Sequence, residues 1–325
     1  MNITILGAGA YALGLAYRFS KNKNNRIIMW SAVKEEIDVL NKTNMNERAL
    51  PGVKMPKGII YTTNTEKAID GANIVVLAVA TKFLRSVCET VKPYVKDKHI
   101  VIASKGIEQS SCEFASNIVK DVLRTKKLCT ISGPSFAIDM VHDDLVGLSI
   151  ATTNNKTKEI VIKALSSDTL KLRPTKDFIG VELCGTLKNV IAVISGMLDG
   201  MKVSESTKAM FLTESINDTR HLIKKMKGNE KTIMSYAGFG DMLLTCTSTT
   251  SRNYSFGVLL GQEKTKEELD EYLKNNTVEG VYTLKSIYGL LHSKRIKMPF
   301  IEIVYDIING KKKTSDIIPF LKEKE

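Results

Sequence analysis

A single lysine, Lys188, stands in an otherwise small and apolar stretch of the chain, CGTLKNVIAVISG at residues 184–196. If this stretch is helical, its neighbours one turn away include Cys184 and Ile191, and no carboxylate lies within reach along the helix. Loss of solvent around such an amine, together with a second cation, would lower its pKa toward the range used in acid–base catalysis. The alternative is a lysine at the edge of the core that extends its ammonium group into solvent.

Two other short segments bring polar groups to the expected ends of strands. The run ASKGIE places Lys105 just past the carboxyl end of a strand, where open α/β sheets bind ligands. The run ISGPSF at residues 131–136 ends another strand in a turn that could present backbone N–H groups and the Ser135 hydroxyl. Taken alone, either segment could be an ordinary loop.

The segment AGFGDMLLTCTSTTSRNYSFG, residues 237–257, combines a glycine turn with several polar side chains. Asp241 and Thr245 have the spacing that puts two side chains on one face of a helix. Arg252, followed by Asn253, suits a phosphate group, because a planar guanidinium can donate two parallel hydrogen bonds. A polar surface loop is the alternative interpretation.

The stretch LGAGAYALGLA, residues 6–16, nearly matches the glycine pattern of dinucleotide-binding proteins. In that pattern the first glycine allows a tight turn, the second allows close approach of the pyrophosphate, and the third lets helix pack on strand. Gly7 and Gly9 fill the first two positions and Ala12 the third. The following helix N-terminus, with Ala10, would offer unpaired N–H groups to phosphate. The glycines could instead be turn residues only, but the strand before and the helix after them favour nucleotide binding.

The stretch WSAVKEE, residues 30–36, bears on the choice of dinucleotide. The end of the second strand normally carries an acidic residue for the adenosine ribose when NAD is bound, and Ser31 stands there instead. Without a carboxylate a 2′-phosphate is not repelled, and Ser31 and Lys34 could bind one. The sequence therefore favours NADP (NADPH), with NAD as the second option, although Lys34 could equally be a surface residue.

These residues need a scaffold, and the hydrophobic pattern predicts one. Alternating apolar runs and helical patterns in the first half are typical of a parallel sheet covered by helices. Strands are expected at residues 3–6, 26–30, 59–62, 73–79, 100–104, 129–132 and 145–151, with helices such as 34–40 and 82–94 between them. After a strand-like run that ends at Pro174, helical periodicity predicts helices at 178–198, 204–225 and 267–274.

We therefore predict an α/β fold, a Rossmann-like, doubly wound and mostly parallel sheet followed by an all-α C-terminal domain. The expected domains are a dinucleotide-binding domain at 1–175 and a helical substrate and catalytic domain at 176–325, with the active site in the cleft between them.

Composition narrows the possible partners. The formal net charge is +12, but the lysines are scattered and not interleaved with aromatic residues, which favours a solvated surface over nucleic-acid binding. The longest apolar run, residues 74–80, is short of the roughly 20 needed to cross a bilayer, so we expect no membrane insertion.

The first strand begins too near Met1 for a secretory signal, and five widely spaced cysteines without a C-x-x-C pair indicate reduced thiols. A cytoplasmic protein without a metal site is expected.

Six segments, in this order and at these spacings, carry a closer resemblance. They are GAGAY, ASKGIE, ISGPSFA, FIGVELCGTLKNVIA, AGFGDMLLTCTSTTSRN and VEGVYT. Together they resemble the bacterial NAD(P)-dependent glycerol-3-phosphate dehydrogenases, from the first strand to KMPFIEIVYDII. The resemblance implies reversible hydride transfer between sn-glycerol 3-phosphate and dihydroxyacetone phosphate, which supplies glycerol phosphate for phospholipid synthesis.

The resemblance also implies roles for individual residues. Lys188 matches the general acid/base, and Lys105 a second substrate-contacting lysine whose charge would help to lower the pKa of Lys188 if the two lie close. Asp241 is expected to orient Lys188 or a substrate hydroxyl. The expected substrate contacts are Lys105, Gly133, Ser135, Lys188, Asp241, Thr245, Ser251, Arg252 and Asn253. Besides the glycine loop and Lys34, the expected cofactor contacts are Tyr11, Ser31, Lys105, Ala137, Arg252 and Glu279.

Two other functions remain open on these residues. A related two-domain dehydrogenase that uses a lysine could act on a hydroxy acid or ketopantoate, because a carboxylate also binds arginine. A basic nucleotide-binding protein that has lost catalysis is the other, although Lys105, Lys188 and Asp241 together argue against it. The sequence leaves a homodimer possible.

Overall fold

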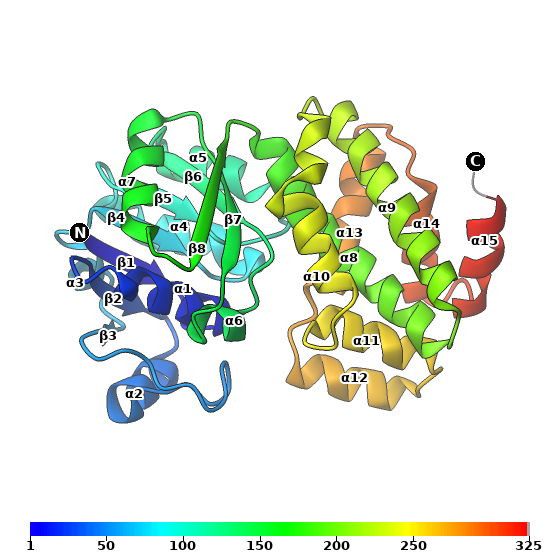
Figure 1. The fold of residues 1–325 in the computed structure, drawn as a ribbon, viewed down its shortest axis with the longest axis horizontal. Helices are drawn as coiled ribbons and strands as arrows, with labels where there is room; N and C mark the ends of the chain where they lie inside the picture. Colours follow the sequence, from blue (N-terminus) through cyan, green and yellow to red (C-terminus); the bar gives the residue numbers. More distant parts are fainter. Residues whose placement is uncertain (324–325) are drawn as a thin grey trace. The chain divides into compact units, whose positions relative to one another are not determined.

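The computed structural model describes residues 1–323 and divides the chain into two compact units (Figure 1). The first unit consists of residues 1–105 and 114–181. The second unit contains the short segment 106–113 and the chain from Glu182 onward. The division at Val181 and Glu182 differs from the expected one at residues 175 and 176, because helix α8 begins in the first unit and continues into the second.

The first unit is an eight-stranded sheet with the order β3-β2-β1-β4-β5-β6-β7-β8. All neighbouring strands are parallel except β6 and β7, so β7 and β8 run opposite to the other six. The strands are β1 (Asn2–Leu6), β2 (Arg26–Trp30), β3 (Ile60–Thr62), β4 (Ile74–Leu77), β5 (His99–Ile102), β6 (Leu128–Ser132), β7 (Val146–Ala151) and β8 (Leu170–Thr175). This arrangement confirms the predicted doubly wound, mostly parallel sheet.

Alternating side chains of the central strands face two separate cores. In β4, Ile74 and Val76 join one apolar cluster while Val75 and Leu77 join the other, and all four are fully buried. Burial on both faces explains why the sequence shows a continuous apolar run there instead of alternation. The covering helices are α1 (Ala10–Lys21), α2 (Lys34–Thr43), α6 (Ala137–Val141) and α7 (Asn155–Leu165) on one face, and α3 (Thr65–Ile69), α4 (Leu84–Val91) and α5 (Ala115–Leu123) on the other.

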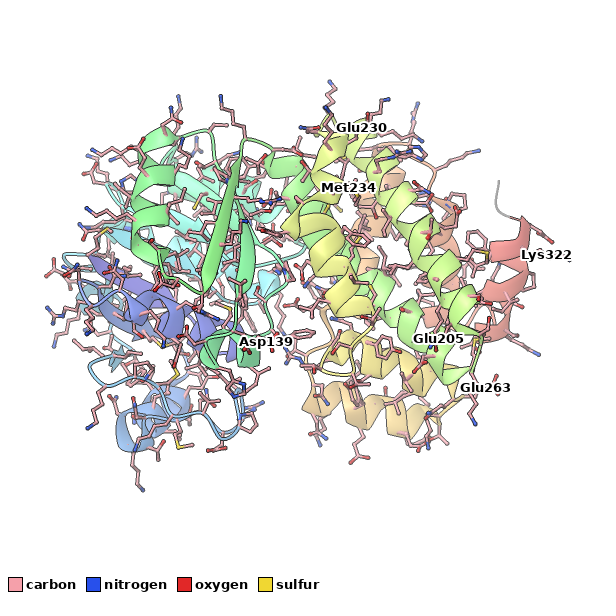
Figure 2. The ribbon with its side chains drawn as sticks, in the orientation of Figure 1. Asp139, Glu205, Glu230, Met234, Glu263 and Lys322 are labelled. Atoms are coloured by element: carbon pink, nitrogen blue, oxygen red, sulfur yellow. The ribbon has the colours of Figure 1, made fainter. Side chains whose placement is uncertain are left out.

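Helix α1 is fixed in place by Arg18, a guanidinium without solvent exposure. Its Nη1 pairs with Asp143 Oδ1 at 2.9 Å. Its Nη2 donates to the carbonyls of Asp139 (3.1 Å; labelled in Figure 2) and Asp144 (2.6 Å). These contacts of Nη1 and Nη2 offset much of the cost of burying the charge, although the buried Nε has no hydrogen-bond partner, and they hold α1 against the segment 139–144.

The second unit is built from helices. They are the rest of α8 (Phe178–Gly200), α9 (Glu205–Lys225), the turns η3 (Glu230–Met234) and η4 (Tyr236–Gly240), α10 (Asp241–Cys246), α11 (Arg252–Gly261), α12 (Lys266–Asn275), α13 (Glu279–Ser293), α14 (Pro299–Ile308), the turn η5 (Thr314–Asp316) and α15 (Ile317–Glu323). The predicted all-α C-terminal part is confirmed. Exposed charged side chains, among them Glu205, Glu263 and Lys322, cover its outer surface (Figure 2).

Helix α8 is the central element of the second unit. It is long and apolar enough to cross a membrane by composition alone, but 89% of its most apolar window is buried inside the structure, as in a core helix. The contact between α8 and α11 is unusually close, because each helix contributes two glycines to it: Gly196 and Gly200 of α8, and Gly257 and Gly261 of α11. A Cβ atom added at Gly196 would lie 1.9 Å from the Tyr254 carbonyl oxygen, and one at Gly257 would lie 1.9 Å from that of Val193. Only glycine permits this backbone contact, which fixes α11 against α8.

The predicted elements outside the sheet core are partly confirmed. The expected helix at 82–94 is interrupted: a 3₁₀ turn, η1 (Thr81–Phe83), precedes α4, and a second, η2 (Lys92–Tyr94), follows it and contains Pro93. The run ending at Pro174 is the edge strand β8, where a proline is tolerated because its missing N–H does not break a ladder on both sides.

Candidate functional site

The glycine loop of the first unit joins β1 to α1 and has the geometry expected of a pyrophosphate site. Gly7 has φ +122°, and a Cβ atom there would lie 2.6 Å from the Ala78 carbonyl oxygen, so no other residue fits. Gly9 is the N-cap of α1, carries no side-chain cap, and has open space where a Cβ would stand. The first turn of α1 contains no acidic residue. These features fit an anionic dinucleotide bound at a helix N-terminus.

The third position of the pattern is Ala12, and the next glycine, Gly14, lies two residues further along α1. Ala12, at the expected third position, is fully buried in the core beneath the sheet. Gly14 instead permits the closest contact: a Cβ there would lie 3.3 Å from Met140 Cβ and 3.4 Å from Ala137 Cα. The close packing made possible by Gly14 is therefore between α1 and α6, and it brings Ala137 against the first helix.

The end of β2 differs from the expectation drawn from its sequence. Ser31 Oγ donates to Glu36 Oε2 at 2.7 Å, so a carboxylate does stand at this position, supplied by the first turn of α2. Lys34 Nζ pairs with Asp38 at 2.8 Å, and its side chain is 75% exposed. The premise that this strand end lacks a carboxylate is wrong, because the acidic side chain comes from a residue five positions further along the chain.

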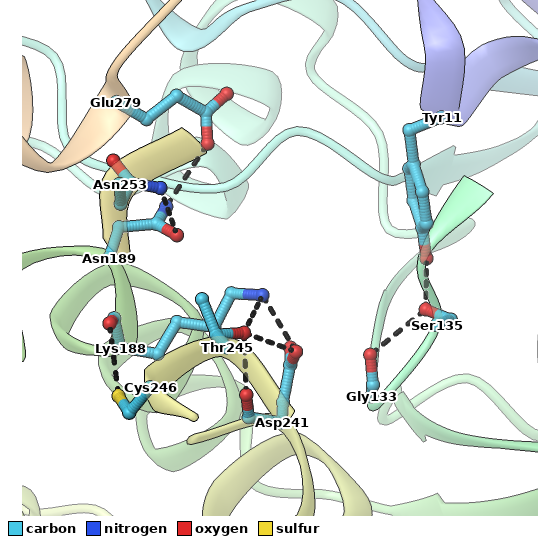
Figure 3. A network of polar contacts seen from close by, with 10 residues as sticks. All are labelled: Tyr11, Gly133, Ser135, Lys188, Asn189, Asp241, Thr245, Cys246, Asn253 and Glu279. Atoms are coloured by element: carbon cyan, nitrogen blue, oxygen red, sulfur yellow. Dashed lines mark hydrogen bonds and ion pairs between the residues drawn. The ribbon is translucent and has the colours of Figure 1, made fainter. Parts of the chain in front are cut away.

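Several predicted residues meet where β1, β5 and β6 end. Tyr11 Oη and Ser135 Oγ lie 3.3 Å apart, and Ser135 Oγ donates to the Gly133 carbonyl at 2.9 Å (Figure 3). The ammonium group of Lys105 lies 5.4 Å from the Tyr11 ring centroid, in cation–π contact. Gly133 is required because a Cβ would lie 2.3 Å from the Gly147 carbonyl oxygen. The structure thus brings these four residues of the first unit together.

The predicted lysine of the second unit is buried beside a carboxylate. Lys188 Nζ lies 2.6 Å from Asp241 Oδ1 and 3.2 Å from Thr245 Oγ1 (Figure 3). The exposed fractions of the two charged side chains are only 11% for Lys188 and 2% for Asp241. Along α8 no carboxylate is near, as expected, but tertiary packing supplies one from 53 residues further on. A pair at this distance in a buried site holds the ammonium group in a fixed orientation.

The turn before α10 positions Asp241. Gly238 has φ −91° and ψ −107°, outside the helical region, and a Cβ there would lie 2.1 Å from the Ile233 carbonyl oxygen. Thr245 Oγ1 donates to the Asp241 carbonyl at 2.6 Å, so its lone pairs are available to accept from Lys188. Burial raises the pKa of the neighbouring Cys246 thiol, which therefore stays neutral. The glycine turn noted in the sequence thus has a structural reason.

A second cluster links α8, α11 and α13. Asn189 Oδ1 accepts from Asn253 Nδ2 at 3.2 Å, and Asn189 Nδ2 donates to Glu279 Oε2 at 3.0 Å (Figure 3). Asn253 Oδ1 accepts from the Gly280 N–H at 2.7 Å. Ser251 is the N-cap of α11, while Arg252, the first residue of that helix, is exposed. Of the predicted residues here, Asn253 and Glu279 are connected to each other through Asn189.

Two residues of these sites were not found from the sequence. Asn189 follows the predicted lysine directly and joins three helices. Asn46 Nδ2 donates to the Ala8 carbonyl at 3.0 Å and so supports the glycine loop from the segment after α2. Buried asparagines are unusual, but neither belongs to a local pattern, so only the tertiary structure shows what they bind. Among residues 1–323, no group of three or more His, Cys, Asp or Glu side chains is placed to hold a metal ion.

These observations define the class of enzyme to which the protein belongs. An open α/β unit that presents a glycine loop and an uncapped helix N-terminus, combined with a helical unit that buries a lysine against a carboxylate, is a nicotinamide-dinucleotide-dependent oxidoreductase.

Comparison with known proteins gives the family. Residues 2–158 match the family described as NAD-dependent glycerol-3-phosphate dehydrogenase N-terminus, and residues 177–319 match the corresponding C-terminus. The chain therefore belongs to the NAD-dependent glycerol-3-phosphate dehydrogenase family, which confirms the resemblance.

Individual relatives agree over almost the full length. The chain is 33% identical to glycerol-3-phosphate dehydrogenase [NAD(P)+] of Fusobacterium nucleatum, covering 98% of this chain and 95% of the relative. It is 32% identical to the protein of the same name from Staphylococcus epidermidis, covering 94% and 93%. The crystal structure of glycerol-3-phosphate dehydrogenase from Coxiella burnetii superposes with a TM-score of 0.93 at 26% identity, covering 99% of both chains. A ketopantoate reductase from Ralstonia eutropha, at 11% identity and a TM-score of 0.62, shares the fold alone.

Proposed function

We propose that this protein catalyses the reversible, NAD(P)-dependent interconversion of sn-glycerol 3-phosphate and dihydroxyacetone phosphate. The observation that carries the proposal is the buried Lys188 and Asp241 pair, in a chain whose relatives are named glycerol-3-phosphate dehydrogenase [NAD(P)+]. A buried, oriented ammonium group is suited to give a proton to a carbonyl oxygen, and the amine that it leaves is suited to take one from a hydroxyl.

The first unit would hold the dinucleotide. The uncapped N-terminus of α1, with Gly7, Gly9, Ala10 and Ala12, would bind the pyrophosphate through backbone N–H groups. Tyr11 belongs to the first turn of α1 and Ala137 packs against Gly14 of the same helix, which supports their proposed role as cofactor contacts. When bound, the nicotinamide supplies or accepts the hydride.

The proton in this reaction is assigned to Lys188. During reduction its ammonium group donates a proton to the carbonyl oxygen at C2, and during oxidation its amine removes the hydroxyl proton. Asp241 acts as the positioning residue, since its carboxylate lies 2.6 Å from the nitrogen that moves the proton. Thr245 supports the same nitrogen from the next turn of α10.

The substrate phosphate is assigned to charged and polar groups, with Arg252 as the main one. Arg252 can donate two parallel hydrogen bonds to phosphate oxygens from the first turn of α11, where the helix dipole also favours an anion. Lys105, Gly133, Ser135, Ser251 and Asn253 are the further substrate contacts of the proposal, and Arg252 and Glu279 also serve the cofactor.

We infer a metabolic role and a location from the same family. The product glycerol phosphate would supply phospholipid synthesis in the cytoplasm, and a homodimer is the proposed assembly. The sequence favours NADPH only if no carboxylate stands after β2, and the contact between Ser31 and Glu36 places one there.

A spectrophotometric assay tests the reaction directly. Purified protein is mixed with dihydroxyacetone phosphate and either NADPH or NADH at equal concentration, and loss of the reduced cofactor is followed. We expect turnover with this substrate and none with ketopantoate. Turnover with ketopantoate or another keto acid and none with dihydroxyacetone phosphate would overturn the proposal.

A further inference from the structure

A carboxylate stands at the end of β2, although the residue expected there is a serine. Glu36 belongs to the first turn of α2, and its Oε2 accepts the Ser31 hydroxyl at 2.7 Å. Ser31 is only 5% exposed, whereas Glu36 is half-buried and keeps a face toward solvent. The pair therefore presents an oriented carboxylate and not a free hydroxyl.

The hydrogen-bonding capacity of Ser31 is used inside the protein. A serine hydroxyl has one proton to donate, and this one goes to Glu36. The same oxygen accepts the Val33 N–H at 3.1 Å. To donate to a phosphate, Ser31 would have to break its bond to Glu36 and leave that carboxylate facing the new anion.

The nearby cation Lys34 forms an ion pair with Asp38. Lys34 Nζ lies 2.8 Å from Asp38 Oδ2, one turn further along α2. The first turn of α2 contributes two acidic residues, Glu35 and Glu36, and no uncompensated base. Lys34, Glu35, Glu36 and Asp38 of α2 together carry a net charge of −2, although the whole chain carries a formal charge of +12.

Hydrogen bonds tie this strand end to the glycine loop. The Gly7 N–H donates to the Trp30 carbonyl at 2.7 Å, and Leu6 is paired with Trp30 in the ladder between β1 and β2. Ser31 is the next residue in the chain. In dinucleotide-binding sheets the acidic group that binds the adenosine ribose stands at this place relative to the loop.

We propose that Glu36, held by Ser31, accepts hydrogen bonds from the adenosine ribose hydroxyls and makes this protein prefer NADH over NADPH. A carboxylate accepts two hydroxyl protons well but repels a 2′-phosphate, which has no proton to donate at neutral pH. In NADPH the 2′-hydroxyl is lost as a donor to Glu36 and a like charge is added, and both changes weaken binding, while partial exposure of Glu36 to salt solution weakens the repulsion. The inference rests on the proposed function, because it concerns the cofactor of that reaction.

Binding of non-reacting nucleotides tests this preference without catalysis. Isothermal titration calorimetry compares adenosine 5′-monophosphate with adenosine 2′,5′-bisphosphate, and NADH with NADPH, on the full chain. For the unaltered protein we expect each ligand without the 2′-phosphate to bind at least about tenfold more tightly than its phosphorylated counterpart. Equal affinity, or tighter binding of the 2′-phosphorylated ligand, would overturn the inference.

A matched pair of variants separates Glu36 from the general charge of α2. Glu36→Gln keeps the size of the side chain and should reduce the preference to less than about threefold, through weaker NADH and tighter NADPH binding. Glu35→Gln removes the same charge from the neighbouring, exposed residue and should leave the preference unchanged. An equal reduction in both variants would refute a specific role for Glu36.

The outcomes also distinguish this inference from the function on which it rests. If both dinucleotides bind but NADPH is preferred, the inference fails and the proposed reaction stands. If neither dinucleotide binds to the folded protein, the cofactor assignment of the proposed function fails, and the inference with it.

Discussion

Replacing Asp241 by Asn is the most direct perturbation of the proposed proton-transfer site. The substitution keeps the shape of the side chain and one oxygen that can accept from Lys188, but removes the negative charge 2.6 Å from the ammonium group. The two side chains are 11% and 2% exposed, so solvent does little to replace the lost charge. Removing one partner of a buried ion pair costs about 3–5 kcal/mol, and the retained acceptor favours the lower end.

The destabilisation caused by Asp241→Asn can be measured in the helices that carry the Lys188 and Asp241 pair. A loss of about 3 kcal/mol corresponds to roughly hundredfold faster amide hydrogen exchange in peptides of α8 and α10 that open together. Hydrogen exchange followed by mass spectrometry resolves these peptides from those of the sheet. Exchange in β4, which is fully buried in the first unit, should be unchanged and serves as the internal control.

A double-mutant cycle decides whether the charge pair is the cause. Lys188→Met keeps most of the apolar stem and removes the ammonium group, so Asp241→Asn should cost less than about 1 kcal/mol in that background. If Asp241→Asn accelerates exchange equally with and without Lys188, the ion pair does not supply the stability, and the orientation argument for Asp241 is refuted.

Three further perturbations address other parts of the structure. Lys188→Ala should lower kcat by at least about a hundredfold while the dissociation constant for NADH, measured by calorimetry, stays nearly constant; unchanged kcat would contradict its role as acid and base. Gly9→Ala, at a position with open space around the added methyl, should leave the melting temperature unchanged but weaken dinucleotide binding at least about tenfold, because the methyl occupies the approach to the helix N-terminus. Burial and the charges of Lys127 and Lys156 lower the pKa of His99 below its usual 6.5. As the pH falls below 6.5, the unfolded chain therefore binds a proton at His99 more readily than the folded protein does. The free energy of unfolding of the unaltered protein should therefore fall more than that of His99→Gln between about pH 7.5 and pH 5.5 in urea titrations, and equal falls would count against this assignment.

The strands of the first unit could be predicted because their side chains are buried on both faces. Runs such as Ile74–Leu77 are apolar without interruption, and their positions follow from the sequence to within a few residues. The reversed direction of β7 could not be predicted, since an apolar run carries no information about which way its strand runs. That direction depends on pairing with β6, which is decided only when the sheet assembles.

The site could be predicted where a residue contrasts with its surroundings. Lys188 was found because a charge among small and apolar residues is conspicuous, and Asp241 because it follows a glycine turn. Their contact could not be predicted, since 53 residues separate them along the chain. The role of Glu36 could not be predicted from the strand-end position, because its carboxylate reaches that place from the first turn of the next helix.

The glycine loop shows how a departure from a sequence pattern can be compensated in the structure. The pattern requires a small residue where the helix crosses the sheet, and Ala12 satisfies it while remaining fully buried. The glycine at position 14 meets a different need, since its missing Cβ lets α1 approach Ala137 and Met140 of α6. Helix α6 begins directly after the turn that carries Ser135, whose hydroxyl reaches Tyr11 of α1. Gly14 therefore couples the loop that would bind the pyrophosphate to the turn that would bind the substrate, and a bulkier residue there would separate the two.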